Sequence, residues 1–227
     1  MNLHLFSNGN IEAIVEASRP YLSGKSEARV AYLPLASLLP EKWLDFTTKA
    51  FNGLARIAMV NTESMSAAEI EAILRRVHLV FIPGGNTFLL NHRLYLSRLV
   101  PFLRRKILAG LPVVAASAGT VLCGPNILTS RDMNSVETSC FTGLNLLPFN
   151  LSVHYPDDEL GRAYADDWLA DYHVFHDNPV ILMSDGASVK VEKNGTKLVG
   201  GDAWVLRAGQ EKEKLLPGRT IKPAGGP

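Results

Sequence analysis

Short, uninterrupted apolar runs alternate with longer helical patterns along this chain, and this alternation constrains the fold more than any other feature. A strand with one face in water alternates apolar and polar residues, whereas a parallel strand covered by helices on both faces is apolar throughout. The sequence therefore predicts an α/β fold with a mostly parallel central sheet and helices on both faces. The expected strands of this sheet are Leu3–Ser7, Ala28–Pro34, Ala55–Val60, His78–Ile82 and Val113–Ala116.

The segments between and after these strands carry the helical patterns. Ser66 with Glu69 three residues later forms the pattern of a capping box at a helix start. Strands are expected at Val180–Met183, Val189–Glu192 and Leu198–Leu206, the last two forming a small hairpin that turns at Asn194–Gly195. The other expected helices are Ile11–Leu22, Pro40–Leu54, a segment after Asn86 that is interrupted near Pro101, and Ala163–Tyr172.

Length and composition narrow the class of protein. We expect residues 1–207 of the 227 to form one α/β domain, and the Gly- and Pro-rich residues 208–227 to form a loose tail. The net charge of +1 favours neither a nucleic acid nor a membrane as partner. Two cysteines suggest no disulfide framework and fit a cytoplasmic setting. The first residues predict a strand rather than a signal peptide, and no apolar run is long enough for a membrane span.

Two strand ends carry candidate chemistry, PGGN at residues 83–86 and ASAGT at residues 116–120. A serine on a tight strand-to-helix turn holds its hydroxyl clear of the sheet, needs small neighbours, and has helix N–H groups behind it. Ser117 fits this pattern, although Ala115 replaces the first glycine of G-x-S-x-G. The Gly-Gly pair could supply a second oxyanion donor. The alternatives are that Ser117 only caps a helix, and that PGGN is a plain turn or a phosphate loop.

A nucleophilic serine needs a histidine base and an acid that orients it. Of the six histidines, His154 ends the run NLSVH before a polar loop, which suits a cleft. Asp185 follows an apolar strand and precedes a glycine, although Asp-Gly is also a common turn. Asp132 with His173 or His176 would instead give the Ser, Asp, His order of α/β-hydrolases.

Several stretches resemble one known family across nearly the whole chain. PGGNTFLL, ASAGTVLCGPNILTSRDM, GLNLLPFNLSVHY and the MSDG turn resemble peptidase E, the family of α-aspartyl dipeptidases. The resemblance implies a class I glutamine-amidotransferase-like, flavodoxin-like three-layer fold and a Ser, His, acid order. It implies that Ser117 is the nucleophile, His154 the base, and Asp185 the replacement for a family glutamate. Gly85 and Ala118 would then supply the oxyanion-hole N–H groups.

The resemblance also implies a serine-type dipeptidase that cleaves short peptides, such as those with an N-terminal aspartate, without metal or organic cofactor. Its partner would be a small peptide, and the protein a monomer or small homo-oligomer. Asp132 matches a family aspartate and would hold the substrate's amino group. Leu128 stands where the family commonly has an arginine, so the preference for aspartate does not transfer with the triad. The candidates for further substrate contacts are Asn86, Arg131, Tyr155 and Arg162.

Three other functions remain open at this point. A glutamine-amidotransferase-type enzyme needs a cysteine at the elbow, and Cys123 lies six residues beyond it. A cyanophycinase-like hydrolase of Asp-Arg polymer would use the same triad. A non-catalytic binding protein could retain the fold, and a histidine beyond hydrogen-bond reach of Ser117 would favour it.

Overall fold

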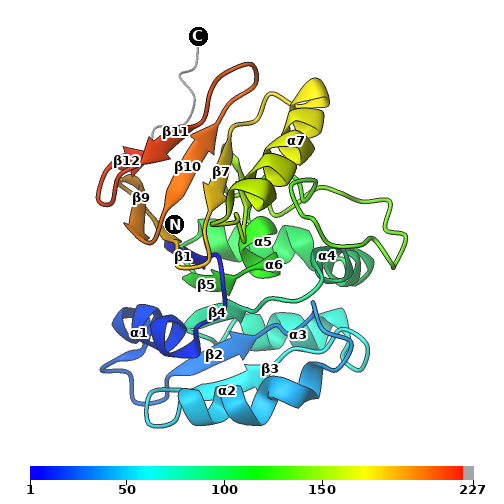
Figure 1. The fold of residues 1–227 in the computed structure, drawn as a ribbon. Helices are drawn as coiled ribbons and strands as arrows, with labels where there is room; N and C mark the ends of the chain where they lie inside the picture. Colours follow the sequence, from blue (N-terminus) through cyan, green and yellow to red (C-terminus); the bar gives the residue numbers. More distant parts are fainter. Residues whose placement is uncertain (222–227) are drawn as a thin grey trace.

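The computed structural model describes residues 1–221, and a mixed sheet of eight strands lies at its centre (Figure 1). The strand order is β12-β9-β8-β1-β5-β4-β2-β3. Strands β1 to β5 run parallel, which confirms the predicted core, whereas β8, β9 and β12 extend it in antiparallel fashion. The strands are β1 (Leu3–Phe6), β2 (Arg29–Tyr32), β3 (Arg56–Met59), β4 (Leu79–Ile82), β5 (Val113–Ala116), β8 (Ser188–Glu192), β9 (Gly195–Gly200) and β12 (Thr220–Ile221).

Helices cover both faces of this sheet, which explains the uninterrupted apolar strands. Along β5, Val113 and Ala115 join one hydrophobic cluster, while Val114 and Ala116 join another. Side chains of α1 and α2 pack in the second cluster, and those of α3 to α6 pack in the first. The helices are α1 (Ile11–Leu22), the 3₁₀ turn η1 (Pro40–Trp43), α2 (Leu44–Ala50), α3 (Ala67–Leu74), α4 (Thr87–Leu96), α5 (Val100–Leu108) and α6 (Ala118–Val121).

A second sheet of four strands, in the order β11-β10-β7-β6, lies beside the first in Figure 1. Helix α7 packs on one face of it through Leu169 and Tyr172, which share a cluster with Leu182. From the same sheet, Ile181 and Met183 join the main core. The elements are β6 (Asn150–Ser152), α7 (Glu159–Phe175), β7 (Val180–Met183), β10 (Ala203–Leu206) and β11 (Glu213–Leu215). This arrangement joins two sheets through one continuous hydrophobic core.

Most predicted elements are confirmed, and two expectations near the C-terminus are wrong. The hairpin of β8 and β9 forms, with Glu192 paired to Gly195. Residues 198–206 do not form one strand, because Gly201, with φ of 69°, turns the chain from one sheet to the other. The expected loose tail contains β11 and β12 up to residue 221. The remainder of that tail, residues 222–227, lies outside the described part of the chain.

Local signals behave as expected at the helix starts. Ser66 and Glu69 form a complete capping box on α3. Pro101 lies in the first turn of α5, where its missing N–H costs no helical hydrogen bond. Over residues 1–221, every helix is too short or too polar to cross a bilayer.

Candidate active site

Ser117 lies on a strained turn between β5 and α6. Its backbone has φ of 51° and ψ of −115°, a conformation that non-glycine residues rarely adopt. Its N–H donates to the carbonyl of Phe6 at 3.0 Å, which ties the turn to β1. The serine holds the cap position of α6, but its side chain makes no capping hydrogen bond. Its hydroxyl instead contacts His154 Nε2 at 2.9 Å, so the side chain is directed into a site rather than onto the helix.

Glycines are required around this turn because neighbouring backbone fills the space a side chain would need. A Cβ on Gly119 would lie 2.3 Å from the carbonyl oxygen of Ile82 on β4. A Cβ on Gly84 would lie 2.9 Å from the Cβ of Ser117. Gly85 has φ of 133°, and its Cβ would lie 2.5 Å from the carbonyl of Ala36. The PGGN turn and the serine turn are therefore fitted against each other.

Two backbone N–H groups flank Ser117 from these neighbouring turns. Within residues 1–221, neither the Gly85 N–H nor the Ala118 N–H has a hydrogen-bond partner. Ala118 is buried, whereas Gly85 is exposed. An N–H group that has no partner within the protein and lies near a nucleophile can donate to an oxyanion. The arrangement is compatible with an oxyanion hole.

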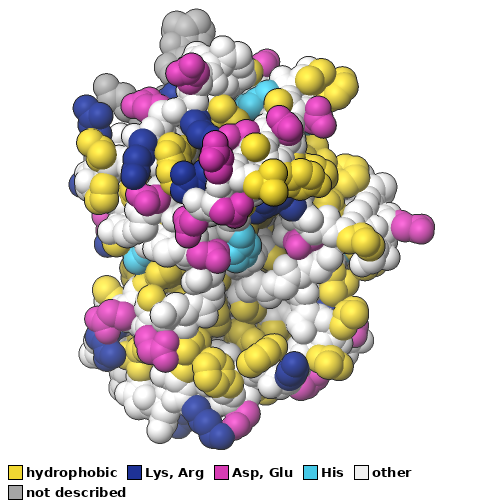
Figure 2. All heavy atoms as spheres, in the orientation of Figure 1, with side chains coloured by type: hydrophobic (Ala, Val, Ile, Leu, Met, Phe, Trp, Pro, Cys, Tyr) yellow, Lys and Arg dark blue, Asp and Glu magenta, His cyan; other side chains and the backbone are white. Residues whose placement is uncertain are grey.

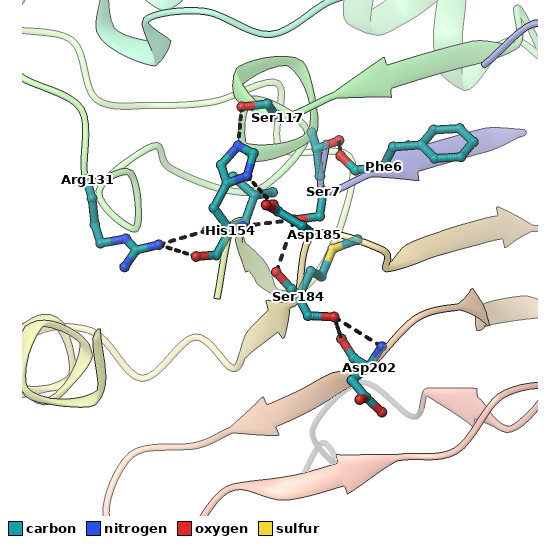
Figure 3. Close-up of polar contacts among 11 residues, drawn as sticks. Phe6, Ser7, Ser117, Arg131, His154, Ser184, Asp185 and Asp202 are labelled. Atoms are coloured by element: carbon teal, nitrogen blue, oxygen red, sulfur yellow. Dashed lines mark hydrogen bonds and ion pairs between the residues drawn. The ribbon is translucent and has the colours of Figure 1, made fainter. Parts of the chain in front are cut away.

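His154 and Asp185 come from the second sheet. β6 and β7 are parallel neighbours, so their carboxyl ends lie together, and each residue follows its strand by two positions. His154 Nδ1 lies 2.5 Å from Asp185 Oδ1, which completes the chain Ser117–His154–Asp185 in Figure 3. The order Ser, Asp, His is not formed, because His173 contacts the carbonyl of His176 instead of the serine.

Hydrogen bonds with the side chains of Ser7 and Arg131 hold the His154 backbone in a left-handed conformation, with φ of 56°. Its N–H donates to Ser7 Oγ at 2.9 Å, and Ser7 Oγ donates to the carbonyl of Met183 at 3.0 Å. Arg131 Nη2 donates to the carbonyls of His154, at 2.6 Å, and Val153, at 3.2 Å (Figure 3). Ser7 is a residue that the sequence analysis missed. It directly follows β1, whose Phe6 pairs with Ala116 before the nucleophile, so the strand-end rule could have found it.

Asp185 sits on a turn that Ser184 fastens to the strand opposite. The Ser184 N–H and hydroxyl both donate to the carbonyl of Asp202, at 3.0 and 2.9 Å (Figure 3). The Asp202 N–H donates back to Ser184 Oγ at 3.1 Å. Gly201 is necessary here because a Cβ would lie 2.3 Å from Gly186 and Ala187. The backbone of Asp185 is thus fixed in position, while its side chain is 61% exposed.

Ser117 and His154 open onto a cavity of about 380 Å³, which we call the polar cavity. Asp132 and Arg131 line it, as does Tyr164 from α7, which the sequence analysis missed. Asp132 Oδ2 accepts hydrogen bonds from the Thr87 N–H, at 2.7 Å, and the Thr87 hydroxyl, at 2.6 Å. The carboxylate therefore has a fixed position on the cavity wall, at the start of α4.

Three predicted substrate contacts lie elsewhere or have other partners. Tyr155 is buried beneath α7 and donates to Asp166, so the prediction that it lines this pocket is wrong. Arg162 lies over the Trp204 ring and donates to the carbonyl of Pro156, outside the cavity lining. Asn86 caps α4 through Oδ1, and its Nδ2 donates to the carbonyl of Met133. The Asn86 amide is thus a brace between α4 and the loop carrying Asp132.

The other candidate nucleophile is unsuitable. Cys123 is fully buried, and burial raises the pKa of its thiol to about 12. Leu128, where the resemblance leads us to expect an arginine, packs against the cluster under α7. Within residues 1–221, no three His, Cys, Asp or Glu side chains come together as a metal site.

The chain matches known proteins over most of its length. The model of Peptidase family S51 matches residues 3–199. A "Peptidase E" of Streptomyces coelicolor is 30% identical, over 97% of this chain and 93% of its own length. A "Probable alpha-aspartyl dipeptidase" of Drosophila melanogaster is 35% identical over 65% of this chain, and the match spans 64% of that relative's length. In structure, a peptidase from an acI-B1 Actinobacterium has a TM-score of 0.68 and 15% identity, covering 97% of this chain and 96% of its own.

Proposed function

Because the chain belongs to peptidase family S51 and is a serine dipeptidase, we propose that Ser117, His154 and Asp185 form its catalytic triad. The observation that carries the proposal is the continuous hydrogen-bonded chain of these three side chains, at 2.9 and 2.5 Å, behind a strained serine turn. It also argues against the non-catalytic alternative, which would be favoured by a histidine out of reach of the serine.

In the proposed mechanism each residue has one task. Asp185 accepts the Nδ1–H of His154, so Nε2 keeps a lone pair that accepts the hydroxyl proton of Ser117. The Ser117 oxygen attacks the peptide carbonyl, and the tetrahedral oxyanion accepts the N–H groups of Gly85 and Ala118. The imidazolium then donates its proton to the leaving amine as the C–N bond breaks. Water, deprotonated by His154, hydrolyses the acyl-enzyme in the second half of the reaction.

The polar cavity supports the binding of a peptide's N-terminal residue. Asp132 has one carboxylate oxygen held by Thr87, and its negative charge suits the α-ammonium group of a substrate. Arg131 lines the same cavity, and its guanidinium suits a carboxylate side chain such as that of an N-terminal aspartate. The name of the Drosophila relative supports this substrate class. Because Arg131 also holds the His154 backbone, substrate binding and triad geometry are coupled through one side chain.

The test is hydrolysis of a dipeptide panel by the wild-type protein and by Ser117→Ala. The panel contains Asp-X, Glu-X, Asn-X and Ala-X, with free amino acid as the product measured. We expect cleavage of Asp-X, and loss of at least about 10⁴-fold in kcat for Ser117→Ala. Ser18→Ala, at a buried serine on α1 outside the polar cavity, is the control and should retain kcat within about twofold.

Two outcomes would contradict the proposal. If Ser117→Ala keeps the wild-type rate, another group is the nucleophile. If the wild-type protein is folded but cleaves no dipeptide while it cleaves Asp-Arg polymer, the cyanophycinase-like alternative replaces the dipeptidase.

A further inference from the structure

A second and larger cavity, of about 740 Å³, adjoins the candidate active site, and we call it the apolar cavity. It lies at the carboxyl ends of β2, β4 and β5, between the 34–39 loop, η1 and the start of α1. In Figure 2 the face of the molecule is hollowed between the region of α1 and α2 and the region of α7, and hydrophobic side chains gather around the hollow. Its volume is in the range of sites that bind small molecules.

The lining of the apolar cavity is hydrophobic and partly exposed. Leu38 and Leu39 are 78% and 63% exposed, and Trp43 and Phe46 are about half exposed. Large apolar side chains gathered around one concave site usually mark a binding surface. Lys42 supplies the single charged side chain among the residues lining the cavity, all of which the structure describes, and its amino group lies 5.0 Å from the centre of the Trp43 ring.

The apolar cavity is continuous with the catalytic turns. Gly84 and Gly85 of the candidate oxyanion turn line it, and so does Ala116, which directly precedes Ser117. Gly84 also packs against the Ser117 side chain. Gly84 therefore touches both the apolar cavity and the side chain of Ser117, which itself lines the polar cavity.

The walls of the apolar cavity are preformed. Arg93, buried on α4, donates to the carbonyls of Leu35, at 3.0 Å, and Ser37, at 2.5 Å. Its other Nη pairs with Glu63. The Asn86 N–H donates to the carbonyl of Ala36 at 2.9 Å. Because these bonds hold the 34–39 loop against α4, little ordering of this loop is required when a ligand binds.

We propose that the apolar cavity binds the residue on the C-terminal side of the cleaved bond, and that it selects dipeptides whose second residue is bulky and apolar. The proposal rests on the proposed function, since the polar cavity is there assigned to the N-terminal residue. A second residue such as phenylalanine or leucine brings an apolar side chain for Leu39, Trp43 and Phe46. It also brings a free carboxylate, which suits Lys42 at the rim. The apolar lining thus matches the side chain of the second residue, and the lysine matches its carboxylate.

The first test is binding to Ser117→Ala, which needs no turnover. Isothermal titration calorimetry compares Asp-Phe with Asp-Ala, and Ala-Phe with Ala-Ala. We expect the Phe peptide of a pair to bind at least about tenfold more tightly, because it buries a much larger apolar area. Equal affinities within both pairs would overturn the proposal, and so would a lack of any detectable binding at millimolar peptide.

The second test uses variants in the otherwise wild-type protein. Leu39→Glu should lower kcat/KM at least about tenfold more for Asp-Phe than for Asp-Ala, because a carboxylate would enter the apolar lining that the phenylalanine side chain contacts. Leu108→Glu is the matched control, since Leu108 is also exposed but lies on α5, outside the cavity lining. Lys42→Gln should lower kcat/KM for Asp-Phe about threefold or more and leave kcat/KM for Asp-Phe amide unchanged.

The failures of the two proposals are distinguishable. Ser117-dependent cleavage with equal kcat/KM for Asp-Phe and Asp-Ala, unchanged in Leu39→Glu, would overturn the apolar subsite and leave the triad in place. The opposite result is that Phe peptides bind tightly to Ser117→Ala, that Leu39→Glu abolishes this binding, and that the wild-type protein cleaves no peptide. That result would leave the apolar subsite in place and overturn the catalytic triad.

Discussion

The two halves of the candidate site are built on different physical principles. The half that carries Ser117 lies on buried β4 and β5, and glycines fitted against backbone define its geometry. The half that carries His154 and Asp185 lies on the second sheet, and hydrogen bonds from Ser7, Arg131 and Ser184 define its geometry. The side chains of that second half are 44% and 61% exposed.

This difference teaches where precision comes from in each half. In a close-packed interior an added atom has no free space, so it lowers the free energy of unfolding. The exposed hydrogen bond between the His154 and Asp185 side chains contributes little to stability, but it sets orientation and tautomer, on which the rate depends. We therefore expect substitutions in the serine half to lower stability, and substitutions in the histidine half to lower the rate.

The largest expected effect tests the histidine half. Asp185→Asn should lower kcat about 10⁴-fold, because an amide cannot select the tautomer with a proton on Nδ1. The free energy of unfolding should change by less than about 0.5 kcal/mol, since the side chain is exposed. Dipeptide hydrolysis and urea denaturation measure the two quantities.

Asp167→Asn is the control for this change, since Asp167 is an exposed carboxylate on α7. A loss of several kcal/mol of stability in Asp185→Asn would contradict the distinction between the halves, and a wild-type rate would remove Asp185 from the triad.

The next effect tests the serine half. Gly119→Ala should destabilise the protein by about 2–3 kcal/mol, because the new Cβ meets the backbone carbonyl of Ile82, which cannot rotate away. Urea denaturation measures the loss. Gly9→Ala is a matched control, since a Cβ there meets nothing within 4 Å. Equal stability of the two variants would show that the glycine is not required sterically.

Ser7 joins the halves, so it should respond in both quantities by a smaller amount. Ser7→Ala should lower kcat about tenfold with KM within twofold, because the His154 N–H and the Met183 carbonyl lose their shared partner. Stability should fall by about 1 kcal/mol.

Ser18→Ala separates positioning from folding. Ser18 is also a buried serine, and its hydroxyl donates to the carbonyl of Ile14 at 2.7 Å. It should lose similar stability without loss of kcat, and Ser7→Thr should regain part of the rate. If Ser18→Ala lowers kcat as much as Ser7→Ala does, the effect of Ser7 is structural only.

The same contrast explains what could be predicted from the sequence. The serine half lies on continuous apolar strands with Gly and Ala at fixed offsets, so β4, β5 and the elbow follow from local pattern. His154 and Asp185 needed the strand-end rule and the family resemblance together, because each is a single polar residue after a short strand.

What could not be predicted depends on contacts between distant segments. Gly201 splits residues 198–206 between two sheets because it packs against Gly186, which no local pattern encodes. Tyr155 lies in a polar loop and Arg162 in the first turn of α7, yet both pack against Trp204 and away from the cavity. The apolar cavity gathers residues from the 34–39 loop, η1 and α1, none of which carries a motif.

The smallest expected effect concerns the strand that carries Ser7. Burial of His4 on β1, aided by the charge of Lys190, lowers its pKa to about 4 from 6.5. Between those values the unfolded chain binds more protons than the folded chain, so stability falls as the pH falls. Glu192 opposes this shift, and His4 Nε2 contacts Ser188 Oγ at 3.4 Å. The stability that the protein has with His4 neutral is fully present above about pH 6.5, and it is lost progressively as the pH falls toward 4.

We expect the wild-type protein to lose about 1 kcal/mol more than His4→Gln between pH 7 and pH 5.5. Urea denaturation at the two pH values measures the difference, and His92→Gln, with a histidine on α4, serves as the control. Because Ser7 directly follows β1 and contacts His154 and Met183, a loss of stability of β1 in acid would loosen the strand that links the two halves. If the wild type and His4→Gln lose the same free energy of unfolding between the two pH values, groups outside β1 cause the loss of stability in acid.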